Sequence, residues 1–432
     1  MGIIKRIFFF TLCGLFFACK KDTTLDTPSV QIIAPVGLQT FNVFDTIIVQ
    51  AHVSDADGLK SVNISLTNDQ SVQVLGAVTV NITSNSMTFN WPYILSDIHL
   101  ASGQYYITVT ASNGTNSFSA YQKVYVNAVP TKRVTVYAFT RNAGSVQVWQ
   151  IDSLFHLSSG PLIQGNFSAS DVSSYYQQVY IAAFDTGSVN ALAFPSNGTL
   201  WQVPGIDSPT PYFTNVYSYG DAAYLSLYGG YIKYYNHQGA VQLSVSTGTQ
   251  YYPIKTFVWN NYIFAEEKNL SSSAENLVLY FASSGMGYQQ IVLLGPVIAM
   301  YGMDNNDVFV FGNQTSGGPY MEDYNVSGNI FYAPYSLPSA KLLSVVQLNS
   351  NQYLLGFNNS TIYQYTYNPV NFLTYISGVN ASHMKYDAVN NQLIVTSNKT
   401  VQEYNCGISS GTLVYSTSLP DSALDVQILF NK

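Results

Sequence analysis

Neighbouring carboxylates are the residues of this sequence whose spacing could support acid/base chemistry. Two such pairs stand in the C-terminal part of the chain, Glu266-Glu267 and Glu322-Asp323. Carboxylates that share one site shift each other's pKa, as a catalytic acid and base require. Adjacent strand residues point to opposite faces, so Glu322 and Asp323, inside a predicted strand, cannot act as one pair. We expect Glu266 and Glu267 to be a solvated strand end, and we predict no catalytic residue.

Candidate metal ligands are few and poorly spaced. Asp55-Ala56-Asp57-Gly58 alternates carboxylates as Ca²⁺ loops do, but the EF-hand continuation is missing and a turn is the better interpretation. The histidines stand alone, without the spacing of a metal pair; they are His52, His99, His156, His237 and His383. We therefore predict neither a metal site nor another cofactor.

The N-terminal cysteines belong to a segment with the layout of an export signal. Lys5 and Arg6 precede an uninterrupted apolar or small run over residues 7–18, which ends at Cys19. A helix of that length reaches about 18 Å, well short of the roughly 30 Å hydrocarbon core of a bilayer. A cleavable signal is therefore favoured over a transmembrane anchor. Cys13 would leave with it, so Cys406 would be the one free thiol, packed or at the surface, with no histidine nearby in sequence.

The residues around Cys19 carry a resemblance to a known class. Leu15-Phe16-Phe17-Ala18-Cys19 resembles the lipobox of bacterial lipoproteins, which implies cleavage before Cys19 and acylation of that residue. The start that follows, Cys19-Lys20-Lys21-Asp22, resembles lipoproteins of the Bacteroidota. The resemblance implies an outer-membrane lipoprotein, held by its N-terminal lipid, on the cell surface or the periplasmic face. The alternative is an ordinary signal peptide with an incidental cysteine. We assign residues 1–18 to the signal peptide and 19–29 to a tether.

Composition excludes one class of partner and indicates the fold class. Charged residues make up 9% of the chain, its net charge is −7, and 35 tyrosines supply much of its polarity. A typical protein has about a quarter of its residues charged. With few clusters of Lys or Arg there is no electrostatic footprint for a phosphate backbone, so nucleic acid is not expected as a partner. Aromatic and β-branched residues interrupted by Gly and Asn predict an all-β protein.

The first part of the body, residues 30–127, alternates apolar and polar residues in about seven short runs. Two of these runs flank Asn113-Gly114, where positive φ is readily adopted, and predict a hairpin. About 100 residues with this pattern suit a β-sandwich. The block resembles the immunoglobulin-like modules of bacterial surface proteins, most clearly in the stretch GQYYITV at residues 103–109. No cysteine pair is present to link the sheets as in antibodies.

The remaining residues, 131–432, contain an internal repeat. The segments SVQVW, SVNAL, YIKYY, NLVLY, YMEDY, TIYQY and TVQEY recur at intervals of 43, 43, 45, 44, 41 and 39 residues; they end at Trp149, Leu192, Tyr235, Tyr280, Tyr324, Tyr365 and Tyr404. Two β runs precede most of these segments and one follows. Four strands recurring at this period are typical of a propeller blade. The sequence predicts seven blades, with the repeated aromatic packed between neighbours.

The two ends of the repeat region are incomplete in complementary ways. The first repeat, which begins at Arg133, has three predicted strands, whereas the C-terminus has a spare one, ALDVQILF, at residues 423–430. We expect this spare strand to become the innermost strand of the first blade. Such a clasp closes the ring and removes two exposed sheet edges.

The sequence lacks the motifs that mark propeller families with recognisable activities. There is no WD40 signature and no sialidase box, and Ala183-Phe184-Asp185-Thr186-Gly187 matches the quinoprotein repeat once, one residue short and without its Trp. We predict a non-enzymatic envelope protein that binds a glycan or an envelope protein, because Tyr and Asn give contact area and adaptable hydrogen bonds. The alternative is a propeller-type polysaccharide lyase or glycosidase, which needs well-placed carboxylates or a His, Tyr and Arg set around the central channel. The sequence nominates no ligand-binding residue.

Overall fold

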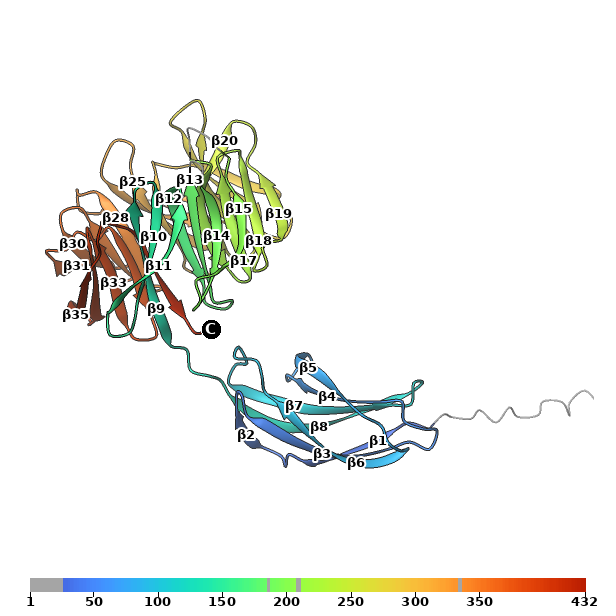
Figure 1. The fold of residues 1–432 in the computed structure, drawn as a ribbon. Helices are drawn as coiled ribbons and strands as arrows, with labels where there is room; N and C mark the ends of the chain where they lie inside the picture. Colours follow the sequence, from blue (N-terminus) through green and yellow to red (C-terminus); the bar gives the residue numbers. More distant parts are fainter. Residues whose placement is uncertain (1–25, 185–186, 207–210, 333–335) are drawn as a thin grey trace, which may run out of the picture. The chain divides into compact units, whose positions relative to one another are not determined.

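The computed structural model describes residues 26–184, 187–206, 211–332 and 336–432. Cys19 and the predicted signal peptide therefore lie outside the described residues. The chain separates into two compact units between Pro130 and Thr131. Every regular element in the described part of the chain is a β-strand (Figure 1). Within these ranges no helix has the length and apolar character that a membrane span requires.

The first unit is a sandwich of two sheets. The smaller sheet has the order β1-β3-β6, and the larger has the order β2-β8-β7-β4-β5. All pairs are antiparallel except β2 with β8, which run parallel. The strands are β1 (Ser29–Ala34), β2 (Gln39–Asn42), β3 (Thr46–Ser54), β4 (Ser61–Thr67), β5 (Gln73–Val80), β6 (Ser86–Ile94), β7 (Gly103–Ser112) and β8 (Ser117–Asn127).

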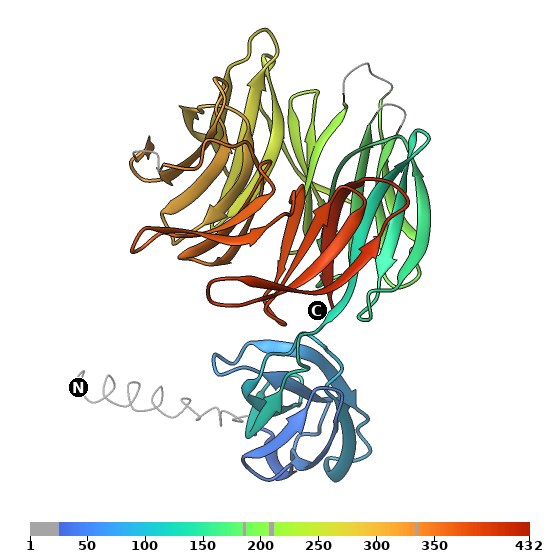
Figure 2. The same cartoon turned by 90° about the vertical axis from the view of Figure 1, so that its left-hand side faces the viewer.

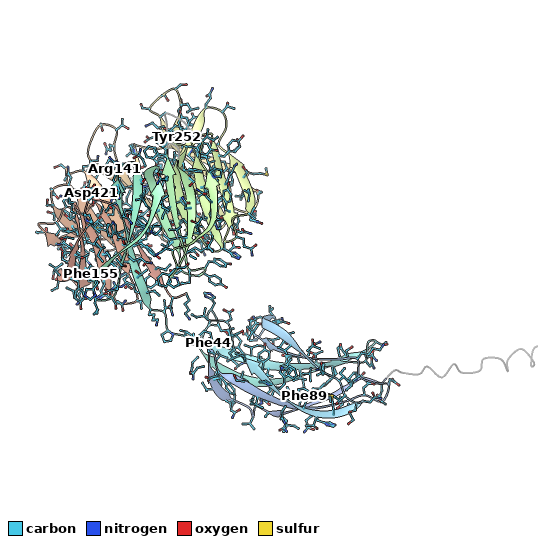
Figure 3. The ribbon with its side chains drawn as sticks, viewed as in Figure 1. Phe44, Phe89, Arg141, Phe155, Tyr252 and Asp421 are labelled. Atoms are coloured by element: carbon cyan, nitrogen blue, oxygen red, sulfur yellow. The ribbon has the colours of Figure 1, made fainter. Side chains whose placement is uncertain are left out.

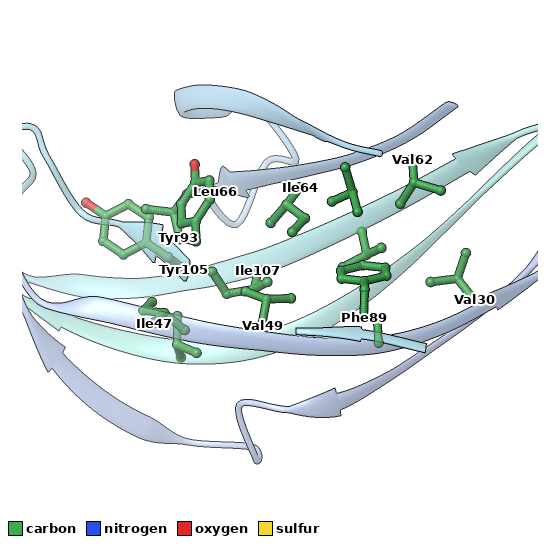
Figure 4. Packing of buried hydrophobic residues seen from close by; sticks show 14 of the residues in the cluster. Val30, Ile47, Val49, Val62, Ile64, Leu66, Phe89, Tyr93, Tyr105 and Ile107 are labelled. Carbon is green, nitrogen blue, oxygen red and sulfur yellow. The ribbon is translucent and has the colours of Figure 1, made fainter. Parts of the chain in front are cut away.

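Strict alternation builds the core of this sandwich. In β3 every second residue is buried, beginning with Ile47 and Val49, and in β4 the same holds for Val62 and Ile64. These side chains from opposite sheets meet in one apolar layer together with Ile107 of β7 (Figure 4). Because a period of two places all of them on one face, the core follows directly from the sequence pattern. The predicted hairpin is present as β7 and β8.

The second unit contains, over the described residues, seven four-stranded sheets, one for each repeat. We number them as blades 1 to 7 and give their strands from the innermost outwards. Blade 1 has β36 (Ala423–Phe430), β9 (Arg133–Asn142), β10 (Ser145–Ile151) and β11 (Leu157–Gln164); blade 2 has β12 (Asn166–Ser173), β13 (Gln178–Phe184), β14 (Ser188–Ala193) and β15 (Thr199–Pro204); blade 3 has β16 (Phe213–Tyr219), β17 (Ala222–Leu227), β18 (Tyr231–Asn236) and β19 (Val241–Ser246).

The remaining four blades follow the same plan. Blade 4 has β20 (Tyr251–Trp259), β21 (Tyr262–Asn269), β22 (Glu275–Phe281) and β23 (Gly287–Val292); blade 5 has β24 (Val297–Gly302), β25 (Asp307–Asn313), β26 (Pro319–Asn325) and β27 (Ile330–Phe331); blade 6 has β28 (Leu342–Asn349), β29 (Gln352–Phe357), β30 (Thr361–Thr366) and β31 (Asn371–Ser377); blade 7 has β32 (His383–Asp387), β33 (Gln392–Ser397), β34 (Thr400–Cys406) and β35 (Gly411–Ser418).

The inner strands close into a ring, which makes this unit a β-propeller. Each inner strand contacts the inner strand of the next blade, and β36 contacts both β12 and β32. The C-terminal strand pairs antiparallel with β9, from Ala423 opposite Thr140 to Phe430 opposite Arg133. The C-terminus accordingly lies beside the start of β9 in two perpendicular views (Figures 1 and 2). The predicted clasp is confirmed.

A buried ion triad reinforces the closure. Arg133 at the start of β9 places one guanidinium nitrogen 3.3 Å from the carboxylate of Asp387 in β32, and the other 3.0 Å from that of Glu403 in β34. The arginine side chain is 10% exposed and both carboxylates are fully buried. Blades 1 and 7 are thus joined by charge as well as by the contact of β36 with β32. This triad was not predicted from the sequence.

The repeated residue of each third strand packs between blades, as predicted. Trp149 is half-buried and donates its indole N–H to Thr140 Oγ1 at 2.9 Å. The other six are almost completely buried; they are Leu192, Tyr235, Tyr280, Tyr324, Tyr365 and Tyr404. Burial of rings of this size at one repeated position contributes about 1.5 to 3 kcal/mol each.

Candidate ligand-binding site

The inner strands gather several of the chain's few ionisable side chains around the axis of the propeller. Asp171 lies on β12, Lys255 on β20, His383 and Lys385 on β32, and Asp425 on β36. Inner strands of a propeller surround its central channel. This axial cluster has two carboxylates and two ammonium groups, so its charges balance.

Within the axial cluster, Asp425 joins the clasp strand to both of its neighbours. Its Oδ2 accepts hydrogen bonds from Ser170 Oγ of β12 at 2.7 Å and from Gln427 Nε2 at 3.0 Å. On the other side, Nδ1 of His383 lies 3.6 Å from its Oδ1. Burial lowers the pKa of His383, while the Asp425 carboxylate opposes that shift. Asp425 is therefore engaged as a cross-link between strands.

Two further members of the cluster are also held by adjacent blades. The Lys255 ammonium donates to the carbonyl oxygens of Val297 at 3.0 Å and Ile298 at 2.6 Å, both in β24. Asp171 Oδ2 accepts the backbone N–H of Ser218 in β16 at 2.7 Å. Burial lowers the pKa of Lys255 and raises the pKa of Asp171. The bonds of this cluster connect inner strands to each other, which is what a closed ring needs.

The expectation for Glu266 and Glu267 is wrong, because both are buried. Their exposed fractions are 1% and 2%. β21 continues to Asn269, so both residues lie inside a second strand that is covered on its two faces. Glu266 Oε1 accepts the backbone N–H of Val297 at 3.0 Å, and Glu267 Oε1 accepts the hydroxyl of Tyr280 at 2.5 Å. Burial raises the pKa of each carboxyl to about 7.

Glu322 and Asp323 also lack the geometry of an acid/base pair. They are neighbours in β26, both are buried, and strand alternation sends them to opposite faces. Asp323 Oδ2 accepts the hydroxyl of Tyr367, at 3.4 Å, on the side of blade 6. Burial raises the pKa of Glu322 to about 7 and that of Asp323 to about 6.

The remaining residues singled out in the sequence have structural roles. Asp55 Oδ1 accepts the N–H of Asp57 at 2.7 Å and Oδ2 accepts the side-chain amide of Asn113 at 3.0 Å, which confirms a turn. Across the described ranges, no three His, Cys, Asp or Glu residues come together as a metal site. Cys406 is free and half-buried, and burial raises its thiol pKa, the opposite of an activated nucleophile. Asp185 and Thr186 lie outside the described residues.

A cavity on the propeller, which we call the tyrosine pocket, was not anticipated. Its volume is about 660 Å³, and it lies between the β12–β13 turn and the β16–β17 turn of blades 2 and 3. The polar and aromatic residues of its lining include Ser174, Tyr175, Tyr176, Ser218, Tyr219 and Asp221. This volume falls within the roughly 300 to 1,000 Å³ of small-molecule sites. Tyr175 is 51% exposed and Tyr219 41%.

Contacts behind the tyrosine pocket fix two of its groups in place. The ring of Tyr176 stacks on that of His237, with centroids 4.1 Å apart and an angle of 3° between the planes. Tyr175 meets Tyr176 edge-on at 4.8 Å. Asp221 Oδ1 accepts the hydroxyl of Tyr234 at 2.7 Å. Burial and the nearby Asp221 carboxylate raise the pKa of Tyr176. The Tyr176 hydroxyl is therefore neutral at physiological pH.

A comparison with protein families concerns the first unit of the structure. Residues 28–109 match the bacterial Ig domain family. This match covers the sandwich from just before β1 to within β7. The immunoglobulin-like resemblance of the first unit is therefore confirmed. A search of curated proteins finds no match for the chain.

Solved structures resemble the chain in fold. A quinonprotein alcohol dehydrogenase-like protein from Bacteroides thetaiotaomicron is 11% identical and aligns over 93% of this chain and 99% of that one, with a TM-score of 0.50. A chain of the mitotic checkpoint complex is 12% identical over 61% of this chain and 80% of its own, with a TM-score of 0.51. The WD40 β-propeller domain of Doa1 is 9% identical over 61% and 86%, at 0.49. At such identities the likeness concerns the fold alone.

Proposed function

We propose that this protein is a lipid-anchored component of the cell envelope whose propeller binds a glycan or a protein without catalysing a reaction. The observation that carries the proposal is the tyrosine pocket. It is concave and partly aromatic, with a few polar groups at the turns of two adjacent blades, which is the general form of a ligand site. Anchoring rests on the sequence around Cys19.

The state of the carboxylates supports binding over catalysis. A glycosidase needs two carboxyl groups that flank one bond of the substrate. In this propeller the adjacent pairs, Glu266-Glu267 and Glu322-Asp323, are split between strand faces and buried against neighbouring blades. Asp425 of the axial cluster accepts hydrogen bonds from Ser170 and Gln427. None of these groups faces the tyrosine pocket.

One observation favours the enzymatic alternative, a polysaccharide lyase or glycosidase. Asp171 and Asp425 stand on adjacent inner strands, near Lys255 and His383, and Asp425 contributes to the raised pKa of Asp171. A channel enzyme would need such groups. The variant His383→Gln separates the two functions, because His383 lies against Asp425 and not against a residue that lines the tyrosine pocket. In a channel enzyme that uses this cluster it would reduce the release of new reducing ends from a polysaccharide panel, and pocket-dependent binding would be unchanged.

Binding is tested with the chain from residue 26 to 432, which holds both compact units. The protein is applied to a glycan array and used in a pull-down from solubilised envelopes of the native cell. The matched comparison is Tyr175→Ala/Tyr219→Ala, which empties the tyrosine pocket of its two exposed rings. We expect at least one array or pull-down partner that the double variant loses. Equal results for both proteins would refute the pocket as the binding site.

A further inference from the structure

The lining of the tyrosine pocket selects among classes of ligand by charge. Asp221 is its one charged side chain, and neither Lys nor Arg lines it. A phosphate, sulfate or carboxylate ligand would meet a carboxylate with no compensating cation, which is unfavourable. The neutral groups around Asp221 are hydroxyls from serines and tyrosines, which both donate and accept hydrogen bonds. The pocket therefore suits a ligand rich in hydroxyl groups.

The aromatic rings add a requirement on shape. Tyr175 comes from the β12–β13 turn and Tyr219 from the end of β16 in the adjacent blade, and both line the cavity and are about half-exposed. Aromatic faces carry partial negative charge and attract the weakly positive hydrogens of a C–H surface. A pyranose ring has one such flat C–H face and a rim of hydroxyls. A pyranose stacked on these rings would present its hydroxyls to the polar side chains of the lining, among them Asp221, Ser174 and Ser218.

Contacts behind the tyrosine pocket hold several of its side chains in place before a ligand binds. Tyr176 is clamped by its stack on His237, and the Asp221 carboxylate is oriented by the hydroxyl of Tyr234. The β12–β13 turn is tied to the clasp strand, because Gln177 Nε2 donates to the carbonyl oxygen of Phe430 at 2.7 Å. A ligand entering this pocket would not have to order these groups, which lowers the entropic cost of binding.

We propose that the tyrosine pocket binds a neutral pyranose unit of a glycan, with Tyr175 and Tyr219 as stacking platforms and Asp221 as a hydrogen-bond acceptor for sugar hydroxyls. This inference rests on the proposed binding function and narrows it to one ligand class and one site. A quaternary ammonium ligand would use the same rings through cation–π attraction. Its trimethylammonium group offers no hydrogen bond to the polar side chains of the lining, whereas sugar hydroxyls can bond to Ser218 and can accept from Ser174, whose Oγ already accepts the N–H of Phe430. The sugar is therefore the better fit.

The test uses residues 26–432 and saturation-transfer NMR with the methyl glycosides of glucose, mannose, galactose and N-acetylglucosamine, and with choline. We expect transfer to the ring C–H protons of at least one pyranoside, weakened about tenfold or more by Tyr175→Ala/Tyr219→Ala. The matched control is Tyr121→Ala/Tyr125→Ala, which removes two tyrosines of similar exposure, 55% and 40%, from the sandwich. It should bind as the native chain does.

A conservative variant guards against misfolding. Tyr175→Phe/Tyr219→Phe keeps both rings and should retain most of the transfer. Raising the salt concentration should leave sugar binding unchanged, since a neutral ligand is not screened. Pocket-dependent transfer to choline alone, or a pocket-dependent protein partner with no pyranoside signal, would overturn the sugar assignment and leave a binding function standing. If no probe binds, and neither the array nor the pull-down finds a partner, both the sugar assignment and the proposed binding function are overturned.

Discussion

Buried carboxylates are the unusual residues of this propeller, and they link its stability to pH. Glu266, Glu267 and Glu322 have pKa values raised by burial to about 7, and Asp323 to about 6. In the unfolded chain such groups titrate near 4. Between those values the folded state holds more protons, so stability falls as pH rises from about 4.5 to about 7 and levels off above.

Glu322 isolates this effect, because desolvation is the one cause of its shift and its Oε2 has no hydrogen-bond partner. Glu322→Gln keeps the shape and stays neutral at every pH. We expect the native chain to lose stability between pH 5 and pH 8, and the variant to lose less, by at most about 3 kcal/mol. Urea unfolding at both pH values measures the difference. The exposed Asp69→Asn is the control, and an equal loss in both variants would contradict the assignment.

The Arg133 triad leads to a second prediction. Arg133→Leu would leave Asp387 and Glu403 buried without a counter-charge, which costs about 3 to 5 kcal/mol. The matched control is Arg141→Leu, at the exposed end of the same strand (Figure 3), which should change stability by less than about 0.5 kcal/mol. Denaturant unfolding at pH 7 compares them.

The loss in Arg133→Leu should shrink at pH 5. Burial already raises the pKa of Glu403, and Arg133 opposes that shift in the native chain. Without the arginine, the pKa of Glu403 rises further and the carboxyl can be protonated in mildly acidic solution. A loss that is the same at both pH values would show that the triad acts through packing and not through charge.

Among the strands, the clasp strand β36 has a special role because it closes the ring of blades. Ending the chain at Ser422 removes β36, the inner strand of blade 1, and exposes an edge of β9. It also removes the strand that lies between β12 and β32 and contacts both. Exposed edges promote aggregation. We expect the truncated chain to be insoluble, whereas removal of Asn431 and Lys432 alone, which spares β36, keeps it soluble. Soluble yield and size-exclusion chromatography measure both, and a soluble truncated chain would refute the clasp.

Elements were predictable where a period repeats. A large apolar or aromatic residue recurs near the end of each third strand, aromatic in six of the seven blades, because each blade must fill the same gap. Counting strands in the first and last repeats was enough to place β36. Individual contacts were not predictable in this way. Arg133 and Glu403 are 270 positions apart. The three charges in the run Ala265-Glu266-Glu267-Lys268 predict a solvent-exposed segment, although the neighbouring blades bury both glutamates.

The tyrosine pocket was not predicted either, because its residues are distant in the sequence and follow no repeated pattern. Tyr175 and Tyr176 stand in one turn and Tyr219 at the end of another blade's inner strand, so they match no repeat and no strand alternation. The available signal was the density of aromatics in turns, where polar residues are the norm. Only the ring geometry of the propeller brings the two turns together.

At the scale of the whole molecule, each unit has its own core. The sandwich buries one apolar cluster, and the propeller buries its own clusters between and within blades. Residues 131–432 expressed alone should therefore fold. Their thermal transition should be cooperative, and near-ultraviolet circular dichroism should report ordered aromatic rings. A flat near-ultraviolet spectrum would contradict an independent propeller.

The proposed lipid anchor would be the chain's attachment to the membrane. With a net charge of −7 and 9% charged residues, the chain has little attraction for anionic headgroups. Membrane attachment must then depend on acyl chains, and stable anchoring needs at least two of them. Cys19→Ser removes the acceptor, so it should abolish incorporation of labelled palmitate and move the protein from the detergent phase to the aqueous phase. Cys13→Ser and Cys406→Ser, the matched thiol controls, should keep both properties, and a Cys19→Ser protein that stays with the membrane would disprove the anchor.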